Sequence, residues 1–199
     1  MSLDAIIESL IFAADSPLSL DRICDLLPEH EREEVKAALS DLARLHEERG
    51  GGFCLAEVAG GWQFRTHPDL QEYVARLARV KTAKFSPSAL ETLAIVAYRQ
   101  PVTRTEVEYL RGVDCGGVLK TLLDKRLVRI LGKKDIPGRP LIYGTSKEFL
   151  EVFGLKDLKG LPTLKEIQAL GEVPRFERQE ELPLGTGAAD PQESPLPFE

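Results

Sequence analysis

Apolar residues recur every three or four positions along most of the chain, the spacing of helices that bury one face. In the first eighty residues this pattern predicts helices over residues 3–14, 19–27, 29–48 and 68–80. Two short apolar runs, 53–58 and 62–66, flank Gly60-Gly61 and predict a β-hairpin. In the helix that closes this half, we expect the apolar side chains to face inward: Leu70, Tyr73, Val74 and Leu77.

The next seventy or so residues show a related order of signals. Ser86-Pro87 is typical of a helix start, and Thr103-x-x-Glu106 is the pattern of a capping box on a second helix. A third helix from Gly117 to about Lys125 leads into a strand over 127–131, a Pro137-Gly138 turn, a strand over 141–143 and a helix over 147–153. In the helix after Pro87 we expect an inward stripe made of Leu90, Leu93, Ala94, Ala97 and Tyr98.

The two halves share the same order of helix-breaking residues and core positions. With a shift of 84 residues, Pro17-Leu18-Ser19 falls on Pro101-Val102-Thr103. With a shift of 79, Phe64-x-Thr66 falls on Tyr143-x-Thr145. Helices followed by a hairpin, twice over, predict an α+β, predominantly helical protein of two tandem winged helix-turn-helix domains. We place the domains at residues 1–80 and 86–160, a polar linker at 81–85, a further short helix at 163–170, and a disordered acidic, Pro-rich tail at 171–199.

Charge divides the chain into three segments. Residues 1–80 carry a net charge of −7, residues 81–160 carry +6 and residues 161–199 carry −5, within a total of −6. A basic middle between acidic flanks argues against a simple polyanion binder. No apolar run reaches the length of a membrane span, and the first helix lacks the basic start of a secretion signal, so we expect a cytoplasmic protein.

The residue types of catalytic and metal sites are scattered. Cys24, Cys54 and Cys115 show no C-x-x-C spacing, and the three histidines stand apart from them in the sequence. Neither a Gly-rich phosphate loop nor a G-x-S-x-G motif is present. The sequence therefore predicts no enzymatic activity, no cofactor and no metal site.

Two kinds of binding stay open. The second unit offers cations for weak contact with a DNA backbone, on its third helix and on its wing: Lys120, Lys125, Arg126, Lys133, Lys134 and Arg139. The approach to the third helix, Asp114-Cys115-Gly116-Gly117, nevertheless lacks side chains that read bases, and the counterpart of this helix in the first unit is rich in glutamate. Protein binding fits better, and the apolar first helix suits a dimer contact through Leu3, Ile7, Leu10 and Ile11.

Several runs resemble the family of segregation and condensation protein B, or ScpB. They include SLIFAADSPLSLDRI, GGWQFRTHPDL, SPSALETLAIVAYRQP and GKKDIPGRPLIYGTSKEFLEVFGL, and together they span roughly residues 3–170. The positions that match the family signature, and that we consider for partner binding, are Arg99, Gln100, Pro101, Gly138, Arg139, Pro140, Tyr143, Gly144, Thr145 and Phe149.

The resemblance implies a non-catalytic subunit of the bacterial Smc condensin. Such a protein forms a homodimer through its first domain and binds the kleisin ScpA, which closes the Smc heads. It acts in chromosome condensation and segregation during cell division, in the cytoplasm around the nucleoid. The alternative is a winged-helix DNA-binding transcriptional regulator.

Overall fold

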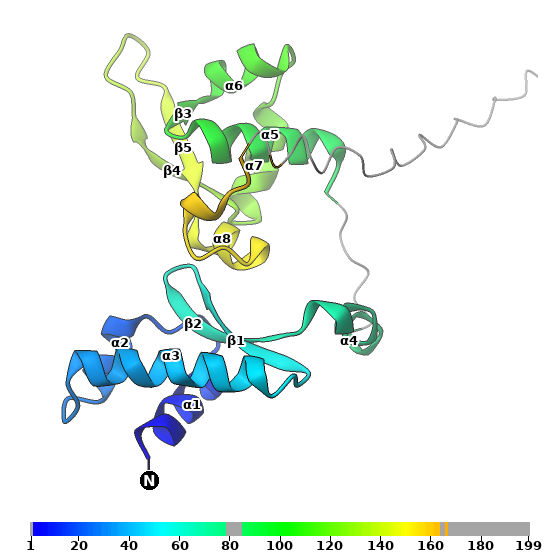
Figure 1. Ribbon diagram of the computed structural model, residues 1–199. Coiled ribbons are helices and arrows are strands. Elements are labelled where there is room, and N and C mark those ends of the chain that lie inside the picture. The colour runs from blue at the N-terminus through cyan, green and yellow to red at the C-terminus, as the bar shows by residue number, and fades with distance from the viewer. Residues whose placement is uncertain (1, 79–84, 164–165, 167–199) are drawn as a thin grey trace, which may run out of the picture. The chain divides into compact units, whose positions relative to one another are not determined.

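The computed structural model describes residues 2–78, 85–163 and 166, and each half of the chain is described by itself (Figure 1). The first half begins with α1 (Leu3–Ala13), α2 (Leu20–Leu26) and α3 (Arg32–Glu48). Serine side chains cap the first two: Ser2 accepts a hydrogen bond from the Ala5 N–H, and Ser19 accepts one from the Arg22 N–H. A capping box between Glu31 and Glu34 starts α3, so that helix begins three residues later than predicted.

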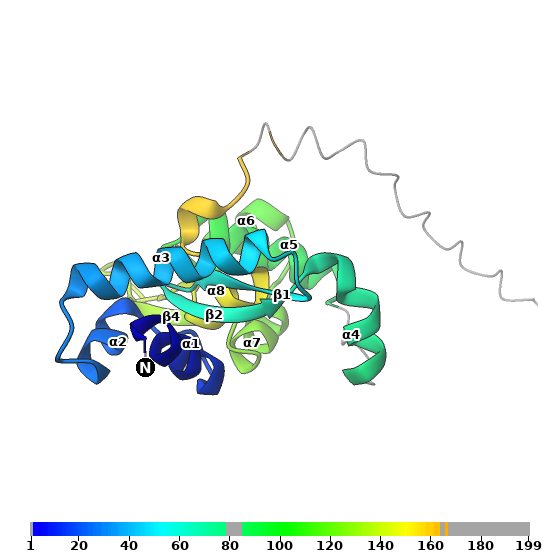
Figure 2. The same ribbon diagram turned by 60° about the horizontal axis from the view of Figure 1, so that its bottom comes forward.

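A β-hairpin completes the core of this half. β1 (Phe53–Val58) pairs antiparallel with β2 (Gly61–Thr66), as predicted, and α3 packs against β1 while α1 packs against β2 (Figure 2). Leu18 forms an isolated antiparallel bridge with Trp62 on the other edge of β2. The buried side chains come from all three helices and from β1: Ile7, Ile11, Ile23, Leu27, Val35, Ala38, Leu39, Leu42 and Leu55.

The segment after the hairpin differs from its prediction. It forms a 3-10 turn, η1 (Pro68–Leu70), and then α4 (Gln71–Ala78), while residues 79–80 lie outside the described residues. The apolar side chains do not face inward: Tyr73 is 65% exposed and Leu77 is 85% exposed. Periodicity correctly predicted a helix with one apolar face, but the first core is already closed by α1, α3 and the hairpin. Figures 1 and 2 show α4 set apart from those elements.

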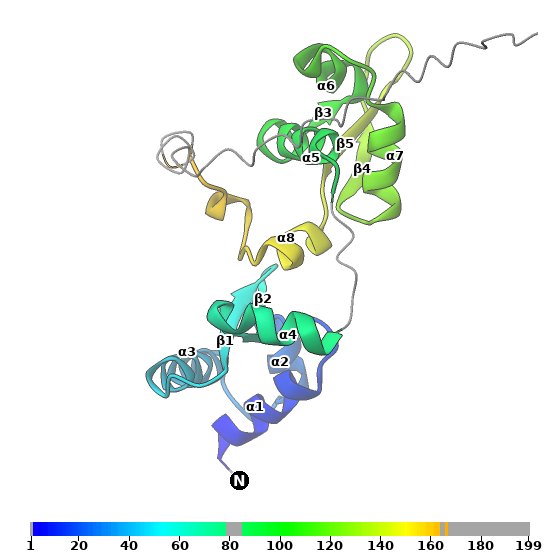
Figure 3. The ribbon, with the colours of Figure 1, turned by 90° about the vertical axis from the view of Figure 1, so that its right-hand side faces the viewer.

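The second half repeats the order of helices and hairpin. α5 (Pro87–Arg99), a two-residue strand β3 (Val102–Thr103), α6 (Arg104–Arg111) and α7 (Gly116–Asp124) precede β4 (Val128–Lys133) and β5 (Leu141–Thr145). The sheet order is β3-β5-β4 with antiparallel pairs, and α5 packs against β5 while α7 packs against β4 (Figure 3). α8 (Lys147–Phe153) is capped by Ser146 at its start and by Gly154 at its end, and the Gly154 φ of 65° is the left-handed conformation that glycine favours.

The inward stripe of α5 is shifted from its prediction. Leu93 and Ala97 are buried as expected, whereas Leu90, Ala94 and Tyr98 are exposed. Their places in the core are taken by Ala89, Thr92 and Val96. Thr92 fits there because its hydroxyl donates a hydrogen bond to the Ser88 carbonyl within the helix.

The predicted linker is also shorter than its composition indicated. Phe85 packs against the second core, and Lys125 Nζ lies 5.5 Å from the centre of its ring. Residues 81–84 of the linker lie outside the described residues, as do most of the short helix over 163–170 and all of the tail.

The fold class is confirmed: the protein is α+β, with helices predominating over two small sheets. Each half has its own hydrophobic core and the element order of a winged helix, with a short edge pairing at Leu18 or β3 ahead of the second helix. The boundaries 1–80 and 86–160 as independent domains stay a prediction.

Candidate partner-binding surfaces

Most residues of the family signature lie inside the second unit. The Gln100 side chain bridges the end of α5 to β5, because its Oε1 accepts a hydrogen bond from the Thr145 N–H at 2.8 Å. Its Nε2 donates to the Ala97 carbonyl and to the Thr145 hydroxyl. Tyr143, Gly144, Thr145 and Phe149 are buried. These five residues hold the unit together and offer little surface to a partner.

The exposed remainder of the signature lies at two places. Arg99 and Pro101 lie at the exit from α5, where the Gln100–Pro101 peptide bond is cis. Gly138, Arg139 and the half-buried Pro140 form the wing turn between β4 and β5. Gly138 and Arg139 both have positive φ, and the Arg139 N–H donates to the Ile136 carbonyl at 2.9 Å. The conformation of this turn therefore accounts for all three positions, and their role in binding stays a prediction.

The cations considered for DNA binding are all exposed. Lys134 forms an ion pair with Glu106 at 2.6 Å, which partly neutralises the charge it could offer to a phosphate. Arg126 has a positive φ of 57°, and its carbonyl accepts a hydrogen bond from the Ser146 hydroxyl. Lys120 and Lys133 have no ion pair with a described carboxylate. DNA contact by this surface stays a prediction.

The four side chains considered for a dimer contact do not share one face. Ile7 and Ile11 are 0% and 2% exposed in the core of their own unit, so they are not available to a second copy. Leu3 and Leu10 are half-buried beside that core. The exposed apolar side chain of α1 is instead Phe12, at 81%. The helical spacing of Ile7 and Ile11 serves the core, and a dimer contact through α1 stays a prediction.

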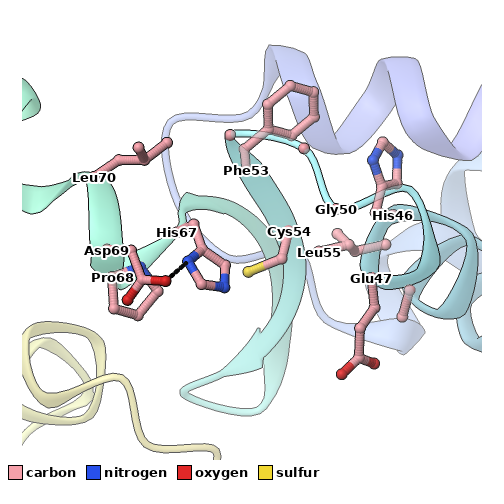
Figure 4. A pocket seen from close by; sticks show the side chains of 13 residues that line it. His46, Glu47, Gly50, Phe53, Cys54, Leu55, His67, Pro68, Asp69 and Leu70 are labelled. Atoms are coloured by element: carbon pink, nitrogen blue, oxygen red, sulfur yellow. Dashed lines mark ion pairs between the residues drawn. The ribbon is translucent and has the colours of Figure 1, made fainter.

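A groove of about 710 Å³ lies beside β1 in the first unit (Figure 4). Figure 4 shows His46 and Glu47 of α3 on one side, His67, Pro68 and Asp69 on the other, and Cys54 between them. The three glycines after α3, Gly50 to Gly52, complete the wall together with Phe53, Leu55, Leu70 and Ala43. Leu55 is buried while Phe53 is 46% exposed, so the groove has an apolar floor that is open to solvent.

His46 fixes the α3 side of the groove, and sequence reasoning missed it. The ring is 5% exposed, and its Nε2 lies 2.9 Å from Glu8 Oε1 of α1. It also packs against Phe53 and Phe64, with ring centres 5.4 and 5.0 Å away. The two glutamates that follow it in the sequence suggested a charged, solvent-facing position, but His46 continues the stripe of Leu39 and Leu42 at helical spacing.

The groove brings together side chains that could suggest catalysis. His67 Nδ1 lies 3.4 Å from Asp69 Oδ2, and Cys54 lies nearby in Figure 4. A Cys-His-Asp site needs the thiol within hydrogen-bond reach of the imidazole, and no such bond joins Cys54 to a described histidine. Half of the His67 side chain is exposed. Within the described ranges no cluster of three or more metal-ligating side chains is found.

Comparison with known proteins gives a consistent answer. A sequence profile described as "Segregation and condensation complex subunit ScpB" matches residues 5–164. A segregation and condensation protein B from Syntrophotalea carbinolica is 54% identical over 170 residues, covering 85% of this chain and 86% of that protein. The chain belongs to the ScpB family. The resemblance found in the sequence is therefore confirmed.

Two further ScpB proteins show how much of each chain the similarity covers. The one from Myxococcus xanthus is also 54% identical over 170 residues, but the present chain spans only 51% of its length. A solved structure, "Crystal structure of dimer of ScpB N-terminal domain complexed with ScpA peptide", is 32% identical. It covers 37% of this chain and 91% of that one, with a TM-score of 0.35. Sequence identity and the profile, rather than superposition, carry the family assignment.

Family membership also bears on the remaining predictions. The family description makes the protein a subunit of a segregation and condensation complex, and it does not favour the transcriptional regulator. In the part of the chain that the structure describes, no helix is both long and apolar enough to cross a membrane.

Proposed function

We propose that this chain is a non-catalytic, homodimeric adaptor of the Smc condensin complex. It binds the kleisin ScpA and, through ScpA, Smc, and it acts in chromosome condensation and segregation in the cytoplasm around the nucleoid. The observation that carries the proposal is the ScpB profile match over residues 5–164, which enclose nearly every described residue. ScpA is also the partner named for the N-terminal domain dimer of the related solved structure.

The groove beside β1 is our candidate for the ScpA contact. β1 is an edge strand, because β2 pairs with it on one side only. An edge strand next to an apolar floor can receive an extended segment, with main-chain hydrogen bonds giving affinity and side-chain pockets giving specificity. Leu55, Phe53 and Leu70 supply the apolar contacts.

The rim of the groove indicates what kind of segment it accepts. Glu47 and Asp69 supply the carboxylates, and Glu47 has no ion pair with a described cation. The whole first unit is acidic, at −7. An apolar segment of ScpA with a basic residue beside it complements this surface, and the charges would increase the association rate and select the register.

The second unit remains a further candidate for the ScpA contact. Its exposed signature positions, Arg99, Pro101 and Arg139, lie on a basic unit of +6 and suit an acidic stretch of the same partner. Its buried signature positions serve the architecture of the unit, so this second contact rests on fewer side chains.

Calorimetric titration of the full chain with a purified central fragment of ScpA tests the proposal. We expect saturable binding, weakened by the double variant Glu47→Lys/Asp69→Lys. Glu33→Lys is the matched control, because Glu33 is an exposed acid of α3 outside the groove. Absence of binding by the wild-type chain would overturn the adaptor function, and equal losses in the control would remove the groove from it.

The DNA-binding alternative is tested in parallel by fluorescence anisotropy with duplex DNA. A chain that binds one duplex sequence selectively and ignores ScpA would be a regulator rather than an adaptor. For the adaptor we expect at most weak, salt-sensitive binding that Lys120→Glu and Lys133→Glu reduce.

A further inference from the structure

The hairpin turn of the first unit contacts the segment that follows α8 in the second unit. The Ala59 N–H donates a hydrogen bond to the Leu155 carbonyl at 2.8 Å. The Gly60 N–H donates one to the Lys156 carbonyl at 3.0 Å. Along the chain the two units are connected through residues 79–84, which lie outside the described residues. These hydrogen bonds are therefore a second link between the units.

The backbone conformation of the turn fits it for this contact. β1 and β2 pair up to Val58 and Gly61, so the turn consists of Ala59 and Gly60 alone. Their φ angles are 53° and 73°, and two positive φ angles are typical of a type I′ turn, which favours Asn, Asp or Gly. An alanine in this conformation persists where surrounding contacts hold it. The hydrogen bonds to the second unit are such contacts.

Arg65 of β2 extends the contact to the last turn of α8. Its Nη1 donates a hydrogen bond to the Glu151 carbonyl at 2.8 Å, in a partly buried place. The last carbonyls of a helix lack partners within the helix and carry partial negative charge, so they attract cations. The last turn of α8 contains no basic residue of its own. A cation of the first unit therefore caps a helix of the second.

The remaining contact between the units is an ion pair at the surface. Lys156 Nζ lies 2.7 Å from Glu57 Oε2 of β1, and the two side chains are 61% and 31% exposed. A pair this exposed contributes little to stability but helps to fix which surfaces meet. The contacts within Met1–Leu161 make it one unit, although the two hydrophobic cores remain separate. An interface of a few polar contacts can open while both cores stay folded.

We propose that these contacts form a latch that holds the two winged-helix units in one body and opens without unfolding either core. Its members in the first unit are Glu57, Ala59, Gly60 and Arg65, and in the second unit Glu151, Leu155 and Lys156. With the latch closed, β1, which borders the groove, is held against the second unit. With the latch open, the linker alone joins the units. The latch does not rest on the proposed function, and a partner that contacts both units would find them already placed.

Hydrogen exchange of the Ala59 and Gly60 amides, measured by NMR on the full chain, tests closure of the latch. A hydrogen-bonded N–H exchanges only when it opens, so we expect both to exchange about tenfold or more below their intrinsic rates. Arg65→Ala removes a hydrogen bond from a charged group and should return both rates to near the intrinsic values. Arg44→Ala is the matched control, because the ion pairs of Arg44 stay within α3.

A substitution in the second unit excludes a local effect on the hairpin. Lys156→Glu sets like charges against each other at Glu57, and we expect the Ala59 and Gly60 amides to exchange about threefold faster. The double variant Glu57→Lys/Lys156→Glu restores opposite charges and should return both rates to within about twofold of the wild type. The Trp62 N–H, which donates to a carbonyl of the first unit at 2.8 Å, is the internal reference and should not change. A double variant that exchanges as fast as Lys156→Glu would contradict the contact.

Residual dipolar couplings show whether the two units move as one body. In the wild type, amides of both units should fit a single alignment tensor, and in Arg65→Ala each unit should need its own. Circular dichroism should show both variants of the latch folded, since neither Arg65 nor Lys156 belongs to a core. Intrinsic exchange rates at Ala59 and Gly60 in the wild type, or separate tensors there, would overturn the latch. Slow exchange and a single tensor in Arg65→Ala would overturn it as well.

Discussion

Gln100 Oε1 accepts a hydrogen bond from the backbone N–H of Thr145, 2.8 Å away and 45 residues later in the chain. The same Gln100 side chain donates to the Thr145 hydroxyl at 2.9 Å and to the Ala97 carbonyl at 3.1 Å. One side chain thus joins the end of α5 to the end of β5. Because Thr145 is buried, its backbone N–H depends on Gln100 for a hydrogen-bond acceptor.

Replacing Gln100 with Ala should therefore destabilise the second unit. The Thr145 N–H loses its acceptor in a buried place, which costs about 1–3 kcal/mol. Urea unfolding of the full chain, followed by circular dichroism, measures the change. Gln71→Ala, at an exposed glutamine of α4, should stay within about 0.5 kcal/mol. Equal midpoints for the two variants would contradict the role assigned to Gln100.

The hydrogen bond between Gln100 and Thr145 also requires a glycine at position 144. A Cβ at this position would lie 2.8 Å from Gln100 Oε1 and 2.8 Å from Leu131 Cδ1. We expect Gly144→Ala to cost about 1–3 kcal/mol through overpacking. Gly132→Ala on β4 is the matched control, since a Cβ there would meet no atom within 4 Å, and its unfolding midpoint should hardly change. A Gly144→Ala variant as stable as this control would show that Leu131 and Gln100 move aside freely.

Local signals predicted most elements of the fold correctly. The Ser86-Pro87 start and the Thr103–Glu106 capping box act within a few residues, so the sequence near each of them carries the information. The positions of side chains across the fold were harder to predict. The stripe of α5 was misplaced because Leu90 and Tyr98 are as apolar as the residues that are buried, and only packing against β5 and α7 decides between them.

The candidate surfaces were likewise predictable only where they depend on local sequence. The signature of the second unit was located from sequence, but Gln100 and Gly144 have structural roles that depend on contacts far along the chain. The groove beside β1 could not be predicted, because it is formed where the end of α3, β1 and η1 meet. Exposure of the α4 stripe was also unpredictable, since periodicity identifies an apolar face without saying what covers it.

Protonation of Glu106 makes the free energy of unfolding depend on pH. Its hydrogen bonds to Lys134 and to the Thr103 N–H and hydroxyl lower its pKa from 4.5 to about 2. Because the pKa is lower in the folded state, the stabilisation is present above pH 4.5 and is lost as the pH falls from about 4.5 to 2. The carboxylate is half exposed, so the contribution is of the order of 1 kcal/mol or less.

Carboxyl NMR titration and acid unfolding check this prediction. In Lys134→Met the Glu106 pKa should rise, because Lys134 is the largest cause of its depression. Glu106→Gln keeps a capping acceptor at the third helical position but cannot titrate, so its unfolding midpoint should vary less between pH 4.5 and 2. An unchanged Glu106 pKa in Lys134→Met would assign the depression to Thr103 alone.

Two substitutions of His46 separate the contributions of packing and of hydrogen bonding to the stability of the first unit. His46→Ala removes a ring that packs against both Phe53 and Phe64 and should cost about 2–4 kcal/mol in urea unfolding of the full chain. His46→Phe keeps a ring there and loses only the hydrogen bond to Glu8, so we expect a loss of about 0.5–1.5 kcal/mol. His30→Ala, on the more exposed His30, controls for loss of an imidazole. Glu8 is 46% exposed and can hydrogen-bond to water instead, so we expect packing to contribute more than this hydrogen bond. A His46→Phe variant as unstable as His46→Ala would show instead that the link from α1 to α3 depends on the Glu8 hydrogen bond.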